Sequence, residues 1–82
     1  MRTGYMRFDA VPGLLPVGQH VFAHIDLNGR LYAVRITLLE RCSGGKAIVQ
    51  YESLSPGVRF GLPVVLYTAD GRLGSLEPMG LG

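Results

Sequence analysis

Two dipeptides, Asn28-Gly29 and Asp70-Gly71, constrain the fold of this chain more than any other feature of its sequence. Such a pair between alternating apolar segments is the strongest short-range signal for a β-hairpin, because a type I′ turn needs positive φ at both central residues. Alternating segments at residues 20–26 and 31–39 flank the first pair. We therefore expect each dipeptide to lie in the turn of an antiparallel hairpin.

Successive side chains of a strand point to opposite faces, so the alternation predicts which side of each segment is buried. In the first hairpin the expected core face comprises Val21, Ala23, Ile25, Tyr32, Val34, Ile36 and Leu38. The expected outer face of the first segment comprises His20, Phe22, His24 and Asp26.

Further turns divide the rest of the chain into short strands. Ser43-Gly44-Gly45 precedes an alternating segment at residues 46–52, and Ser55-Pro56-Gly57 fits a type II turn. The segments 62–69 and 72–77 follow. Val64, Val65, Leu66 and Tyr67 are apolar on both faces of their segment and are expected to be buried.

Five short strands without a helix predict an all-β fold, a small antiparallel five-stranded barrel. A closed barrel also removes the exposed edges of an open sheet. Closely spaced glycines and prolines predict an irregular N-terminal arm over residues 1–18. The single barrel domain is expected over residues 19–78, followed by a loose tail over 79–82.

Composition excludes several classes of protein. The 82 residues suit one domain, and 48% hydrophobic with 17% charged residues is not the composition of a disordered chain. The net charge of +2 comes from seven scattered arginines and Lys46, with no basic run. One cysteine, Cys42, leaves no internal disulfide framework and suits the cytoplasm. Prolines and glycines interrupt the apolar N-terminal segment, so we expect neither a signal peptide nor a membrane span.

The polar residues give no pattern of an active site or metal centre. His20 and His24 on one strand would lie about 13 Å apart, too far to bind one metal ion. Cys42 has no histidine near it in the sequence to act as a base. The acidic residues show no carboxylate pair at a catalytic separation. We expect no metal, no cofactor and no enzymatic activity.

Part of the chain is similar to a known family of small barrels. From Val21 to Leu76 it resembles a PilZ domain, whose members bind cyclic di-GMP. The similar features occur in the family's order: Asn28-Gly29-Arg30, a strand to Leu39, Ser43-Gly44-Gly45, Ala47-Ile48-Val49, Leu54-Ser55-Pro56-Gly57 and an apolar strand that ends in Asp70-Gly71.

The resemblance implies a ligand site but departs from the family's motifs. The family uses an Arg-x-x-x-Arg arm, whereas Arg2 and Arg7 are five positions apart. It also uses an Asp/Asn-x-Ser-x-x-Gly turn, in which Ser43 matches, while Arg41 replaces the acid or amide and Lys46 the final glycine. By this resemblance the ligand-binding candidates are Arg2, Arg7, Arg41, Ser43, Gly44, Gly45 and Lys46.

The sequence therefore favours a non-enzymatic binding or adaptor module, PilZ-like in outline, that acts through protein contacts and takes cyclic di-GMP as a less favoured ligand. A protein partner or self-association is expected, with an interface at Val64, Leu66 and Tyr67. One alternative is a Tudor- or SH3-like barrel that binds nucleic acid through arginines and stacked aromatic rings. Another is an enzyme whose site forms only at a symmetric oligomer interface.

Overall fold

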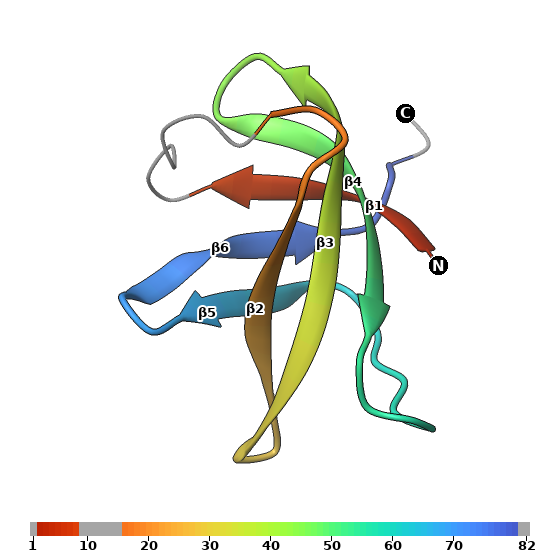
Figure 1. The fold of residues 1–82 in the computed structure, drawn as a ribbon, viewed down its shortest axis with the longest axis vertical. Coiled ribbons are helices and arrows are strands. Elements are labelled where there is room, and N and C mark those ends of the chain that lie inside the picture. Colours follow the sequence, from red (N-terminus) through yellow and green to blue (C-terminus); the bar gives the residue numbers. More distant parts are fainter. Residues whose placement is uncertain (1, 9–15, 81–82) are drawn as a thin grey trace.

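Antiparallel pairing between neighbouring strands organises the whole chain (Figure 1). The computed structural model describes residues 2–8 and 16–80. Their strands close into a barrel in the order β1-β4-β3-β2-β5-β6. The strands are β1 (Arg2–Phe8), β2 (His20–Leu27), β3 (Arg30–Cys42), β4 (Lys46–Ser53), β5 (Val64–Thr68) and β6 (Gly71–Glu77). The expected small all-β barrel is confirmed, with six strands in place of five.

The first hairpin forms as its sequence predicts. Asn28 and Gly29 have φ values of 54° and 86°, as a type I′ turn requires. The Gly29 amide donates a hydrogen bond of 2.8 Å to Asp26 Oδ1, which stabilises the turn. β2 then pairs with β3 over its full length, from His20 opposite Thr37 to Leu27 opposite Arg30.

The predicted core faces of β2 and β3 point into the barrel, as do Ala47, Val49 and Tyr51 of the alternating segment β4. Val21 and Tyr32 are partly buried against the core, at the ends of the predicted faces. Since the buried residues come from all six strands, closure of the barrel creates the core. They are Met6, Ala23, Ile25, Val34, Ile36, Leu38, Ala47, Val49, Tyr51, Leu66 and Leu76.

The prediction that residues 1–18 are irregular is wrong for Arg2–Phe8. This segment is β1, which pairs with β4 on one side and β6 on the other and so closes the barrel. Its pattern includes Gly4, which we interpreted as a breaker. A Cβ at Gly4 would lie 3.0 Å from the Glu77 carbonyl oxygen, so glycine permits this close strand contact. Pro12 and Gly13 lie outside the described residues.

The two loop residues of the second hairpin lie one position earlier in the chain than the Asp70-Gly71 dipeptide predicts. Thr68 pairs with Gly71, so Ala69 and Asp70 form the loop and Gly71 opens β6. Only Gly71 of the Asp-Gly pair has a positive φ, of 118°. The register also shifts between Leu66 and Tyr67, and this bulge accommodates the different turn.

The expectation that all of residues 64–67 are buried is wrong. Leu66 is fully buried, Val64 and Val65 are half-buried, and Tyr67 is 38% exposed. β5 pairs with β2 only at His24–Tyr67 and Ile25–Leu66. Val65 and Tyr67 alternate with the buried Leu66 and so point outward, although the sequence of β5 reads as apolar on both sides.

Candidate functional site

Four of the seven residues suggested by the PilZ resemblance line two separate clefts: Arg7, Ser43 and Lys46 line one, and Arg2 lines the other. The first, here called the Arg7 cleft, has a volume of about 390 Å³ and is lined by Tyr5, Arg7, Cys42, Ser43, Lys46, Glu77 and Pro78. The second, here called the Arg2 cleft, has a volume of about 290 Å³ and is lined by Arg2, Tyr51, Glu52, Ser53, Val58, Arg59 and Phe60.

Strand register brings the basic residues of the Arg7 cleft together. Arg7 of β1 lies opposite Lys46 of β4, and Lys46 lies opposite Cys42 across the β3–β4 turn. Gly44 and Gly45 turn the chain with φ values of 75° and 71°. Arg7 Nε lies 3.3 Å from Glu77 Oε2, so this arginine already has an acidic partner inside the cleft.

Arg2 and Arg7 do not form one arm. They are separated by an odd number of positions on β1, so their side chains leave opposite faces of the strand. Arg2 pairs in register with Tyr51 and lines the other cleft. Arg41 is exposed, pairs in register with Ala47 and does not line the Arg7 cleft.

A third surface gathers ring side chains on the outside of β2 and β5. We call it the aromatic face and define it as His20, Phe22, His24 and Tyr67. Phe22 is 54% exposed, and its ring lies edge-on to that of His20 with centroids 5.3 Å apart. His24 pairs in register with Tyr67 across the strand boundary. The alternation of β2 predicted that His20, Phe22 and His24 point outward. It did not predict that Tyr67 of β5 lies beside them.

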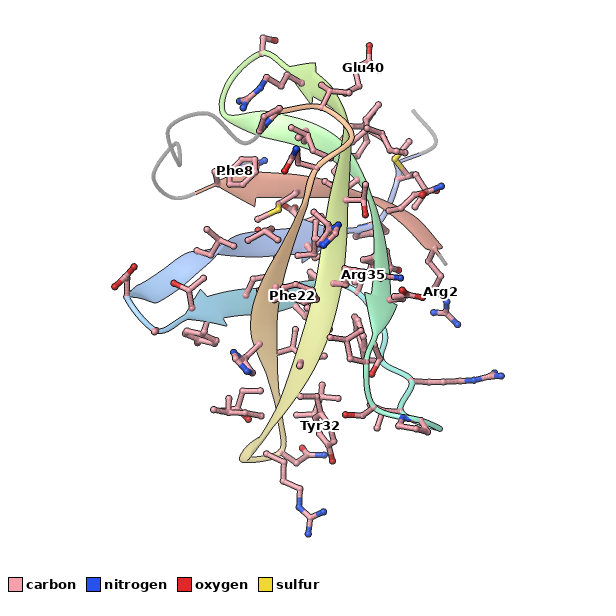
Figure 2. All side chains as sticks on the ribbon, in the orientation of Figure 1. Arg2, Phe8, Phe22, Tyr32, Arg35 and Glu40 are labelled. Carbon is pink, nitrogen blue, oxygen red and sulfur yellow. The ribbon has the colours of Figure 1, made fainter. Side chains whose placement is uncertain are left out.

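Two arginines lie beside the aromatic face, and neither is without a partner: Arg35 pairs with Glu52, and Arg72 of β6 lies opposite Tyr67 and also makes an interaction. Arg35 lies opposite Phe22 in the β2–β3 register and opposite Glu52 in the β3–β4 register. The Arg35 guanidinium donates a hydrogen bond to a carboxylate oxygen of Glu52, and the two form an ion pair. Figure 2 shows Phe22 and Arg35 side by side on the front of the barrel.

The predicted interface residues lie in different environments. Leu66 is fully buried in the barrel and offers no surface to a partner, whereas Val64 is half-buried and lines an open cleft together with Tyr67. An interface centred on Leu66 is therefore contradicted, because the odd and even residues of β5 point to opposite sides. Tyr67 alone of the three is exposed.

The candidates for catalysis are dispersed. Within residues 2–8 and 16–80, no three His, Cys, Asp or Glu side chains gather as a metal ion would require. Cys42 is half-buried in the Arg7 cleft, while both histidines belong to the aromatic face on β2.

Sequence reasoning overlooked Arg59 and Phe60 as partners of Arg2. They lie in the segment between β4 and β5, whose sequence has no alternation from which the direction of each side chain could be predicted.

The described part of the chain contains no helix long and apolar enough to cross a membrane. Comparisons with protein-family models, with curated proteins and with solved structures each found no match to this chain.

Proposed function

We propose that this protein is a small non-enzymatic binding module that acts through contacts with another protein chain, and that the aromatic face is its contact surface. The observation that carries the proposal is the exposure of Phe22 and Tyr67 on adjacent strands, beside two imidazole rings. Aromatic residues at the centre of a patch with little charge are typical of protein interfaces.

The charges around the aromatic face favour protein over nucleic acid. Binding of single-stranded nucleic acid combines stacking rings with a positive groove that neutralises phosphates. Here Arg35, opposite Phe22, is compensated by Glu52, and Arg72, opposite Tyr67, is also not without a partner. Arg2 and Arg59 line a separate cleft. Nucleic-acid binding therefore has less support than a protein contact.

A second copy of this chain is the partner that the face fits best. In a two-fold contact the same patch meets itself, so fixed like charges on the patch would repel. Arg35 and Glu52 form an ion pair within one chain, and Arg72, opposite Tyr67, is also not without a partner. The rings of Phe22 and Tyr67 can then pack against those of a second copy without bringing two uncompensated arginines together.

Replacing Phe22 with serine is expected to weaken self-association at least tenfold, since an exposed aromatic anchor contributes most of its energy on burial. Sedimentation equilibrium over a concentration series measures this. Leu54→Ser is the matched control, because Leu54 is 44% exposed but lies outside the aromatic face. A wild-type chain that stays monomeric throughout the series, or a dimer unaffected by Phe22→Ser, contradicts the proposal.

We keep cyclic di-GMP as a second candidate ligand, with the Arg7 cleft as its place. Arg7, Ser43 and Lys46 line that cleft, and a turn with exposed amides and basic side chains suits a phosphate group. At about 100 times its dissociation constant a ligand adds roughly 2.7 kcal/mol to stability. We expect cyclic di-GMP to raise the melting temperature, and Arg7→Ala to abolish the rise. An unchanged melting temperature contradicts binding.

A further inference from the structure

The Arg2 cleft places two basic side chains beside a pair of aromatic rings. Arg2 comes from the start of β1, and Arg59 comes from the segment between β4 and β5. That segment is shaped by a turn in which the Val58 amide donates a hydrogen bond of 3.3 Å to the Ser55 carbonyl. In Figure 2 Arg2 extends from β1 on the same side of the barrel as this segment.

The aromatic part of the cleft is anchored in the barrel. Tyr51 is 5% exposed and belongs to the core, while Phe60 packs partly buried against it. Their ring centroids are 5.7 Å apart, with an angle of 39° between the ring planes. A Cβ at Gly4 would lie 3.3 Å from Tyr51 Cε1, so the glycine gives this ring its space. The cleft thus has a fixed aromatic wall.

The net charge of the cleft is positive. Glu52 also lines it, but its carboxylate is engaged by Arg35, which approaches from β3. Among the described residues, Arg2 and Arg59 form no ion pair with an acidic side chain. Guanidinium groups bind carboxylates and phosphates through two parallel hydrogen bonds and also stack on flat rings.

We propose that the Arg2 cleft binds a small aromatic anion, a molecule with one planar ring system and a phosphate or carboxylate group. The ring packs against Phe60 at the edge of the Tyr51 wall, and Arg2 and Arg59 bind the anionic group. A volume of about 290 Å³ is at the lower end for ligand pockets, so the ligand has one ring system rather than two. This site is separate from the aromatic face.

Calorimetric titration of the purified protein tests this proposal. The probes are guanosine monophosphate, indole-3-acetate, guanosine and inorganic phosphate. We expect at least one aromatic anion to bind at least tenfold more tightly than guanosine or inorganic phosphate, because only an aromatic anion contacts both the rings and the arginines of the cleft. The first two probes distinguish a phosphate from a carboxylate ligand. Failure of both to bind, or equal binding of inorganic phosphate, overturns the proposal.

Charge substitutions test the assignment to this cleft. Arg59→Gln is expected to weaken the bound aromatic anion about tenfold or more, since it removes a charge-assisted hydrogen bond. Glu52→Gln is expected to tighten binding severalfold, a gain that a folding defect does not produce. Arg30→Gln, at the start of β3 and outside the lining of this cleft, is the matched control and should have no effect. Equal affinity in the wild type, Arg59→Gln and Glu52→Gln places the ligand elsewhere and overturns the proposal.

Discussion

Replacing Leu66 with aspartate is expected to abolish the folded barrel. Leu66 has no exposed surface and packs in the one core that all six strands share. A buried carboxylate without a partner costs several kcal/mol, which is comparable to the total stability of about 5–15 kcal/mol for a small domain. Thermal denaturation followed by circular dichroism should show no cooperative transition for this variant.

The neighbouring substitution Tyr67→Asp is the matched control. Tyr67 points outward and is 38% exposed, so a charge there remains solvated. We expect this variant to unfold cooperatively near the wild-type temperature but to lose the proposed self-association. If Leu66→Asp melts like the wild type, or if Tyr67→Asp fails to fold, the assignment of inner and outer faces on β5 is wrong.

Replacing Gly74 with alanine is expected to cause the second-largest loss of stability, because the added methyl group pushes β1 and β6 apart where they close the barrel. A Cβ at Gly74 would lie 2.1 Å from the Arg7 carbonyl oxygen and 3.1 Å from Phe8 Cα. Both are backbone atoms, so relief requires β1 to move away from β6. Overpacking of this kind costs about 3 kcal/mol, which lowers the melting temperature by roughly 15 °C.

Gly80→Ala provides the comparison for that change. A Cβ at Gly80 has nothing within 4 Å, so the substitution should leave the melting temperature unchanged. If both glycine variants melt at the same temperature, the close approach of β1 to Gly74 is contradicted.

The three central strands were predictable because their information is local. The Asn28-Gly29 turn fixes the register of β2 against β3, and the alternation of apolar residues then fixes the buried face. The same reasoning extends through Ser43-Gly44-Gly45 to β4. By contrast, β1 has no hairpin to define it: it pairs with β4 and β6, and Met6 lies opposite Ala47 and Leu76. Only Gly4 and Met6 of β1 are fully buried, so its alternation is short and includes a glycine, which gives little sequence signal for a strand.

The candidate sites show the same limit. The alternation of β2 placed His20, Phe22 and His24 on its outer face, and they lie there. Arg2 and Arg7 do not share one site, because residues an odd number of positions apart on a strand point to opposite faces. Arg59 and Phe60 lie in an irregular segment, so only the folded chain brings them to Arg2.

The most direct test of the proposed function is to record backbone amide chemical shifts as the protein concentration is raised. If a second copy packs against the aromatic face, concentration-dependent shifts should cluster on β2 from His20 to His24 and on β5 around Tyr67. The same titration of Phe22→Ser should show those shifts reduced or absent. Amide shifts that stay constant with concentration, or that cluster around the Arg7 cleft instead, would contradict the aromatic face as the contact surface.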